Sequence, residues 1–486
     1  MTNFFCFFIF AASRAKRILL QLDVRNGRMN SMFSGWITTR RRFIGYSAAF
    51  SAAGPFVALA ADDPVRSVYE TSDGRATSSV WCRRAYLDLA GRIPTMEEAK
   101  AFAADVAPDK RSRLVDKLLA SEDFADYWAM RYCDILRVKS EFPINLWPNA
   151  VYVYHRRIRE SVAKDESWLD FARSLLAATG SNFRDPETNF LRASAKRTAE
   201  GLSEVASLTF LGEPTAEFAE YFASVTFKST REWKEEIVYL EPGGRTPDEF
   251  AARLAGDLNG RFAAAHASRV WQWIFCAPPS QEQTKELAQY FAKDGFRLKP
   301  FLRRIMLSDS YAQGSVTGSF PVRRLDAEVL DDAICSITGA KREYQSIAPE
   351  PFTFLPPERK SVLIEDGSIS NAFLLLFGRP ARDSGLMTER HNDVTAKQRL
   401  YLFNSGRLYA RLGRLTDGKA FHKRSYTVIF EELYWRFLGR PPAAFEKTVL
   451  ERHLRQAKKI SGKAQWRLPK DVAWCLINSS EFLFRI

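Results

Sequence analysis

Histidine is scarce in this sequence, with 5 among 486 residues. No two of them stand at the i, i+4 spacing by which a helix presents a pair of ligands to one zinc ion. The chain also lacks a Gly-x-Ser-x-Gly elbow and a phosphate-binding glycine-rich loop. A serine triad of the α/β-hydrolase kind and nucleotide chemistry therefore have no support, and no metal site is predicted.

Cysteine is sparse and scattered. The chain has 6 cysteines, with no Cys-x-x-Cys pair and no Cys-x-x-Cys-His motif for covalent haem attachment, so no cofactor is predicted. Those after residue 60 are Cys82, Cys133, Cys276, Cys335 and Cys475. Because their number is odd, at least one thiol stays unpaired even in an oxidising compartment.

Long apolar runs are missing after residue 60. No stretch there approaches the roughly 18 uninterrupted apolar residues that indicate a membrane-spanning helix, so none is predicted in the mature chain. Aromatic residues are abundant at 13%, with 11 Trp. Bulky cores are expected, together with rings that line a groove.

The net charge of +14 is unevenly distributed. Residues 1–60 carry 8 Lys and Arg against a single acid, Asp23, which leaves 63 basic and 56 acidic side chains in the rest. In that remainder, basic runs such as 108–113 are mixed with acids, as is typical of solvated helix faces. Nucleic acid is therefore an unlikely partner.

The N-terminal segment, residues 1–60, has the pattern of an export signal. Paired arginines in Thr39-Arg40-Arg41-Arg42-Phe43-Ile44 precede a mildly apolar stretch that ends in the small-x-small sequence Ala58-Leu59-Ala60. This resembles a twin-arginine signal, which predicts a periplasmic or cell-envelope location; the alternative is an uncleaved anchor. The upstream part fits less well, and Met29 or Met32 is a more natural start.

The body predicts one helix after another. Thr95 to Glu98 forms a capping box, Ser121 and Ser280 open further helices, and Thr246-Pro247-Asp248-Glu249 opens another. We expect a mainly α fold with an N-terminal helical domain (64–240) and a C-terminal one (245–486), separated near 228–245. Residues 340–370 lose the helical period and contain four prolines, which predicts a small irregular or β insertion with a short strand at 361–364.

Two distant segments share a pattern. Ala85 to Pro94 resembles Leu433 to Pro442, each with a Gly-Arg-x-Pro turn, and each is followed by a serine-capped helix start, at 121–124 and 479–482. This predicts divergent helix-turn-helix modules that bury their apolar stripes against each other.

These motifs resemble a family of paired domains of unknown function abundant in planctomycetes and verrucomicrobia, a cytochrome-associated PSCyt-type domain followed by a PSD-type companion. The resemblance rests on 84–95, 118–128, 178–183 and 228–236 in the first half, and on 268–271, 323–328, 377–380 and 478–484 in the second. It implies an exported protein of an assembly for polysaccharide processing or envelope electron transfer.

The sequence departs from that family at two places. Many members carry a Cys- and His-rich motif after the Phe-Leu-Gly turn, where this chain has Glu213-Pro214-Thr215-Ala216-Glu217. Members also tend to have cysteines before a later Glu-Arg pair, where this chain has Gly385-Leu386-Met387-Thr388-Glu389-Arg390. A metal or haem role that depends on those ligands is not expected here.

The candidate catalytic residues are four carboxylates and one histidine. Glu235 and Glu236 follow Trp233, a composition that suits sugar binding; Asp326 and Glu328 follow Arg323 and Arg324, whose charges suit an anionic ligand or an ion-pair network. The histidine is His266, on a helix beside two tryptophans, as a base or as a packing residue.

The candidate binding residues are aromatic or basic: Trp233, Arg269, Trp271, Arg323 and Arg324. They favour an accessory component of an envelope assembly that binds a protein partner or a glycan. The alternative is a carboxylate-dependent enzyme acting on a polysaccharide, with its acid among the four carboxylates.

Overall fold

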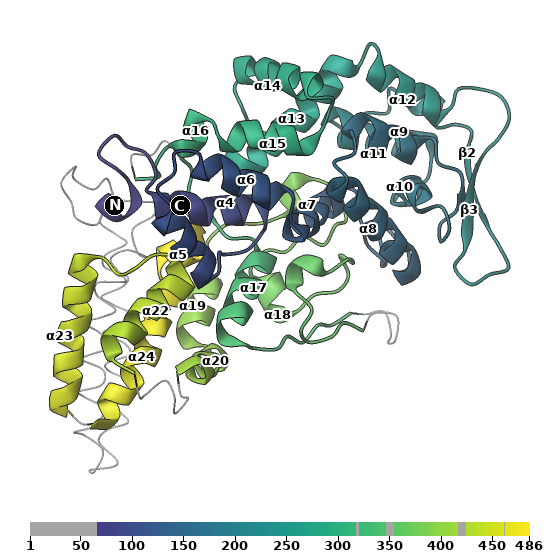
Figure 1. The fold of residues 1–486 in the computed structure, drawn as a ribbon. Helices are drawn as coiled ribbons and strands as arrows, with labels where there is room; N and C mark the ends of the chain where they lie inside the picture. Colours follow the sequence, from purple (N-terminus) through teal and green to yellow (C-terminus); the bar gives the residue numbers. More distant parts are fainter. Residues whose placement is uncertain (1–65, 317–319, 347–353, 417–423, 461) are drawn as a thin grey trace, which may run out of the picture. The chain divides into compact units, whose positions relative to one another are not determined.

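Helices dominate the computed structural model, which describes residues 66–316, 320–346, 354–416, 424–460 and 462–486 (Figure 1). The predicted mainly α fold is confirmed. The predicted export signal and His422 lie outside the described residues. Among those that are described, no helix has both the length and the apolar character that a membrane crossing needs.

The first half, up to residue 240, is a succession of short helices. They are α3 (Arg66–Tyr69), α4 (Ser78–Leu89), α5 (Met96–Ala104), α6 (Lys110–Leu119), α7 (Glu122–Ile135), α8 (Pro148–Ala163), α9 (Trp168–Leu176), α10 (Asn189–Arg192) and α11 (Ala199–Leu211), with the 3-10 helices η1 (Pro186–Thr188) and η2 (Ala219–Tyr221). The predicted capping box opens α5, because the Thr95 hydroxyl accepts from the Glu98 amide and the Glu98 carboxylate accepts from the Thr95 amide.

The second half continues the same architecture. Its helices are α12 (Pro247–Ala255), α13 (Asn259–Phe275), α14 (Gln281–Lys293), α15 (Leu298–Met306), α16 (Asp309–Ala312), α17 (Ala327–Thr338), α18 (Ala372–Leu376), α19 (Ala396–Asn404), α20 (Gly406–Thr416), α22 (Tyr426–Leu438), α23 (Ala444–Ile460), α24 (Gly462–Ile477) and α25 (Ser480–Leu483), with the 3-10 helices η3 (Ser361–Leu363) and η4 (Met387–Glu389). Thr246 and Ser280 cap α12 and α14, as their sequences predict.

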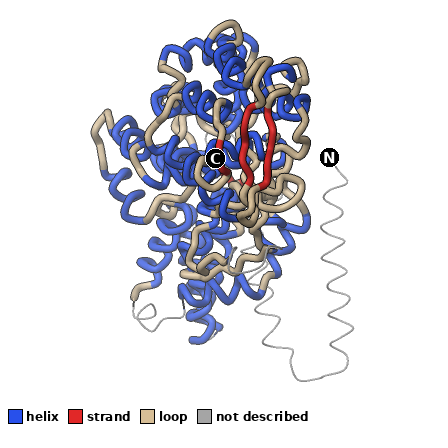
Figure 2. Tube along the Cα trace, turned by 90° about the vertical axis from the view of Figure 1, so that its right-hand side faces the viewer, coloured by secondary structure: helices blue, strands red, loops and turns tan. Residues whose placement is uncertain are grey.

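The longer strands form a hairpin between the two halves. β2 (Val225–Ser229) pairs antiparallel with β3 (Glu236–Leu240), from Val225 opposite Leu240 to Ser229 opposite Glu236, and β1 (Gly180–Ser181) adds to β3 (Figure 2). A second, two-stranded sheet pairs β4 (Arg323–Arg324) with β5 (Phe484–Arg485). The predicted boundary at 228–245 therefore falls on the β2–β3 hairpin.

The strand predicted at 361–364 is wrong, because Ser361–Leu363 forms the 3-10 helix η3. The physical reason is Asp332, whose carboxylate accepts hydrogen bonds from the amides of Ser361 and Val362. These amides are therefore not available to a strand partner. The described part of 340–370 contains one isolated bridge, Gln345 with Ser370.

The two predicted modules have the same internal contacts. In α4–α7, Arg92 donates to both oxygens of Glu98 and to Asp123. In α22–α25, Arg440 donates to both oxygens of Glu446 and to Glu481. Each guanidinium also lies over the ring of the tyrosine six residues earlier, Tyr86 or Tyr434. The sequence echo is thus a repeated, arginine-centred structure, and α5 packs against α22.

The two halves interlock through buried polar contacts. Arg84 on α4 donates to the carbonyls of Tyr311, Gln313 and Ile486, and Arg485 donates to Asp88 at 2.9 Å. Of these six residues, all but Gln313 are buried. Arg485 and Ile486 therefore complete the core around α4.

Candidate functional site

The candidate residues Trp233, Glu235 and Glu236 lie at the turn end of the β2–β3 hairpin. Trp233 exposes 68% of its surface, whereas Glu235 is buried. The Glu235 carboxylate accepts from the hydroxyls of Ser181 and Thr230, which lower its pKa. Glu235 therefore fixes the hairpin turn to β1 as an ionised hydrogen-bond acceptor.

Glu236 is held by two arginines. Arg192 donates at 2.8 Å and Arg197 at 2.9 Å. Burial alone would raise the pKa of Glu236, but the hydrogen bond from Arg192 and the charges of Arg197 and Arg192 lower it. The two adjacent glutamates thus belong to separate structural contacts and do not form a catalytic pair.

Trp233 packs against a second tryptophan that the sequence analysis did not single out. The ring centroids of Trp147 and Trp233 lie 5.4 Å apart at an interplanar angle of 37°, and the Lys234 ammonium lies 5.3 Å from the centroid of Trp147. We name these three residues the aromatic platform. The sequence signal for Trp147 is weak, because a single tryptophan before a proline ordinarily reads as a helix start.

The backbone of the aromatic platform is strained. Trp147 has φ 75° and ψ 145°, and Lys234 has φ 61°. Bulky residues rarely adopt positive φ, and such conformations cluster where the surrounding structure holds a functional surface in place. Here Asn182 contributes to that support, since its Nδ2 donates to the Lys234 carbonyl at 3.1 Å and its Oδ1 accepts from the Glu236 amide at 2.9 Å.

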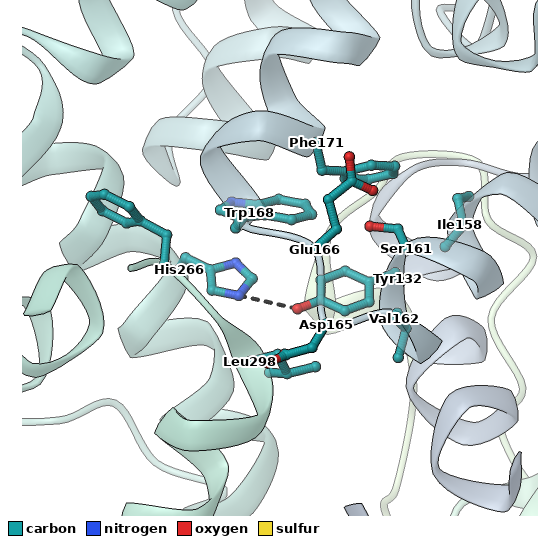
Figure 3. A pocket seen from close by; sticks show the side chains of 11 residues that line it. Tyr132, Ile158, Ser161, Val162, Asp165, Glu166, Trp168, Phe171, His266 and Leu298 are labelled. Carbon is teal, nitrogen blue, oxygen red and sulfur yellow. Dashed lines mark hydrogen bonds between the residues drawn. The ribbon is translucent and has the colours of Figure 1, made fainter. Parts of the chain in front are cut away.

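His266 lines a separate, small pocket of about 20 Å³ between α7, α8, α9 and α13 (Figure 3). Its Nε2 is 3.1 Å from the Tyr132 hydroxyl, and its ring stacks on Trp168 at 4.6 Å and on Phe291 at 4.8 Å. Burial holds the pKa of His266 well below its usual value, so the imidazole is neutral. Within the described chain, neither His266 Nδ1 nor Trp168 Nε1 has a hydrogen-bond partner.

Two carboxylates, Asp165 and Glu166, also line this pocket, and their pKa values are shifted in opposite directions. Burial raises the pKa of Asp165. Glu166 has a lowered pKa: burial opposes the shift, but the hydrogen bonds from Arg157 outweigh it. The pocket thus combines aromatic rings with a neutral histidine, and the sequence identified only His266 of this set.

Arg269 and Trp271, on the same helix as His266, point to other contacts. Arg269 donates to the carbonyls of Thr209 and Leu208, which end α11, and burial lowers its pKa to about 10. Trp271 is half-buried and stacks on Phe275 with centroids 4.0 Å apart. Arg269 therefore caps a helix, and neither residue lines the His266 pocket.

The remaining candidates belong to a buried ion-pair network. Asp326 pairs with Arg131 of the first half, and Glu328 accepts two hydrogen bonds from Arg390. Burial would raise the pKa of Asp326, but the charges of Arg131, Arg323 and Arg390 hold it far below its usual value. Asp134, which sequence reasoning missed, joins the network by accepting from Arg382 and Arg390.

Arg323 and Arg324 donate to backbone carbonyls. Arg323 donates to that of Trp273, and Arg324 donates to those of Leu325, Phe377 and His391. The sequence 323–328 therefore connects the two halves. Among the described residues, no group of three or more His, Cys, Asp or Glu side chains is placed to hold a metal ion.

The fold defines a mainly α-helical protein of two interlocked halves. Residues 66–231 match the family model PSCyt2, described as a protein of unknown function (DUF1549), and residues 247–454 match PSD1, described as a protein of unknown function (DUF1553). The chain belongs to the proteins that carry these two domains in tandem, as the sequence motifs indicate. No curated protein and no solved structure matches it.

The segments 213–217 and 385–390 are both held by side-chain hydrogen bonds. At 385–390, Glu389 accepts from the amides of Asp383 and Ser384, and Arg390 enters the network with Asp134 and Glu328. At 213–217, the amide and carbonyl of Thr215 bond to the hydroxyl of Ser207. Both segments are thus anchored by ordinary side-chain contacts.

Proposed function

We propose that this protein is an exported binding component of a polysaccharide-processing assembly in the periplasm or cell envelope, and that the aromatic platform contacts the glycan. One observation carries the proposal: Trp233 is 68% exposed yet held against Trp147 by a hydrogen-bonded turn. Sugar rings have apolar C–H faces that pack on indole rings, and a platform already fixed in place loses little entropy on binding.

The surroundings of the platform suit a glycan. Arg231 and Glu232 are exposed beside Trp233, and Lys234 lies over the neighbouring indole ring. These groups offer hydrogen-bond donors and acceptors to hydroxyls at the rim of the rings. A protein partner is the other ligand for which an exposed tryptophan is typical, so the test includes it.

Binding without cleavage is favoured over the carboxylate-enzyme alternative by the state of the four candidate acids. A glycosidase requires one carboxyl group with a raised pKa to protonate the leaving oxygen. Glu235, Glu236 and Asp326 all have lowered pKa values, and Glu328 is held in a pair with Arg390. Each acid therefore already stabilises the fold.

The first test is affinity electrophoresis of the full chain in gels that contain soluble polysaccharides, with Trp233→Ala as the variant. We expect at least a tenfold loss of affinity, since truncating a central aromatic anchor costs about 2 kcal/mol. Trp271→Ala is the control, because Trp271 lies outside the platform and is the other tryptophan that was predicted to bind. Equal affinity of the Trp233→Ala variant and the parent would overturn the platform assignment.

The enzyme alternative has its own test. Glu235→Gln, Glu236→Gln, Asp326→Asn and Glu328→Gln variants would be compared with the parent for release of reducing ends from each polysaccharide that binds. We expect no turnover by any of them or by the parent. Turnover that disappears in one folded variant would replace the binding proposal with the carboxylate enzyme.

A further inference from the structure

The positive charge of the chain is concentrated in one segment of the second half. Residues 396–470 hold 18 Lys and Arg against 5 Asp and Glu, a net charge of +13. The other residues after position 60 hold 45 basic and 51 acidic side chains, a net charge of −6. Such an asymmetry within one compact unit creates a directed field that attracts anions to one region.

Helix α23 presents the clearest part of this charge. Lys447, Arg452, Arg455, Lys458 and Lys459 are all exposed. At about 100° per residue they fall within one sector of roughly 140°, and at 1.5 Å per residue they extend along about 18 Å of the helix. We name these five residues the basic face. The opposite side, with Leu450, His453 and Ala457, is buried, and α23 packs on α24.

The five cations of the basic face have no side-chain partner among the described residues. Within the described chain none of them forms an ion pair or a side-chain hydrogen bond, although other arginines pair extensively. The nearby Glu446 is already held by Arg440, which leaves Glu451 as the exposed acid of this helix. Glu451 falls in the same sector at about 100° per residue, so the basic face presents five cations and one acid, a net positive charge.

We propose that the basic face binds an anionic polysaccharide, one whose sugar units carry carboxylate or sulfate groups. The inference rests on the proposed function and narrows its ligand class. Arg452 and Arg455 offer planar forks that match carboxylate and sulfate oxygens. Beyond the helix, Trp466 exposes 62% of its surface beside exposed Arg467, which adds a second ring for a sugar face.

A membrane fits the basic face less well. An interfacial helix inserts an apolar side into the lipid, whereas the exposed positions of α23 are Ala444, Thr448 and Glu451 besides the five cations. Its larger apolar residues face α24 or lie part-buried. Nucleic acid is the other polyanion, and it enters the test as a competitor.

The experiment compares a charged and a neutral polymer with the same backbone, polygalacturonate and its fully methyl-esterified form. The full chain, the Arg452→Gln/Arg455→Gln/Lys458→Gln/Lys459→Gln variant and the Trp233→Ala variant would be titrated by biolayer interferometry. We expect the parent to bind polygalacturonate at least tenfold more tightly than the ester at about 50 mM salt. The difference should vanish in the quadruple variant and near 500 mM salt, because screening removes exposed charge interactions.

The outcomes separate this inference from the proposed function. Equal affinity for both polymers, weakened by Trp233→Ala, would overturn the basic-face inference and leave the platform standing. A charge preference lost only in the quadruple variant, with Trp233→Ala unaffected, would support the basic face and overturn the platform. Tighter binding of duplex DNA or phosphatidylglycerol vesicles through the same four residues would overturn the polysaccharide as its ligand.

Discussion

Arg440 lies deeper than Arg92 at the equivalent place of the repeated module. The side chain of Arg440 is 6% exposed and that of Arg92 is 26% exposed, although both hold a glutamate six residues later. The difference arises because Glu481, the second partner of Arg440, is buried with the Tyr69 hydroxyl against it, whereas Asp123 is part-exposed and also pairs with Lys360.

This difference predicts unequal costs of the same substitution. Arg440→Met leaves Glu481 buried without its cation and should lower the free energy of unfolding by about 3–5 kcal/mol. Arg92→Met leaves acids that water can reach, so we expect about 1–2 kcal/mol. Urea denaturation followed by circular dichroism measures the free energy of unfolding of both variants. Equal decreases for the two substitutions would contradict the deeper burial of Arg440.

Gly91 and Gly339 allow steric contact to be separated from backbone conformation. Both have positive φ, 59° and 63°, but a Cβ at Gly91 would lie 2.2 Å from the Tyr127 ring, whereas one at Gly339 meets nothing within 4 Å. Gly339→Ala should therefore cost about 1 kcal/mol, the ordinary penalty of left-handed backbone. Gly91→Ala should lower the free energy of unfolding by at least twice as much, and thermal unfolding measures both variants. A decrease no larger than that of Gly339→Ala would contradict the close contact of Gly91 with Tyr127.

Burial lowers the pKa of three histidines, His155, His266 and His453, which predicts a pH dependence of stability. Burial lowers the pKa of His155 to about 3 and that of His266 well below its usual value. Below about pH 6.5 the unfolded chain therefore binds more protons than the folded one, so stability falls as pH falls. Between pH 6.5 and 5 the histidines become protonated in the unfolded chain. Once a histidine is fully protonated there, it lowers the free energy of unfolding by about 1.4 kcal/mol for each further pH unit of acidification.

The control for this prediction is the His155→Gln/His266→Gln variant. Its unfolding free energy should depend less steeply on pH over the same interval. The remaining slope comes from His453, whose pKa burial also lowers, and, with the opposite sign, from Asp332, whose pKa burial raises to about 6. Denaturation curves at half-unit steps measure the slope. An unchanged slope in the double variant would show that other groups take up the protons.

The ion pairs of Asp326 should contribute strongly to the stability of the contact between the two halves. Asp326→Asn leaves Arg131 and Arg390 near a neutral amide in a buried site, and should cost about 3–5 kcal/mol. Glu343→Gln is the control, because its pair with Arg407 is exposed on both sides and should contribute less than about 1 kcal/mol. A small effect of Asp326→Asn in a thermal scan would show that the network does not hold the halves together.

Local signals in the sequence were enough for the helices. Thr95, Ser121 and Ser280 cap helices where their hydroxyls and the following residues predict, because a cap depends on contacts within one turn. The repeated Gly-Arg-x-Pro motif could also be recognised in the sequence. The acids to which Arg92 and Arg440 donate could not be predicted from it.

The aromatic platform and the ion-pair network could not be read in the same way. Trp147 meets Trp233, and Asp134 meets Arg390, only after the intervening chain has folded, and nothing in either local sequence marks its partner. The error at 361–364 has the same origin, since Asp332 reaches those amides from another helix.

The contacts of Phe484, Arg485 and Ile486 set a temporal order on folding. Arg324 pairs with Phe484 in the small sheet, and Arg84 donates to the Ile486 carbonyl. Helix α4 therefore emerges from the ribosome long before these partners are synthesised. The first half therefore reaches its final packing only after residues 484–486 have left the ribosome, because Arg84 and Ile486 lie 402 positions apart in the chain.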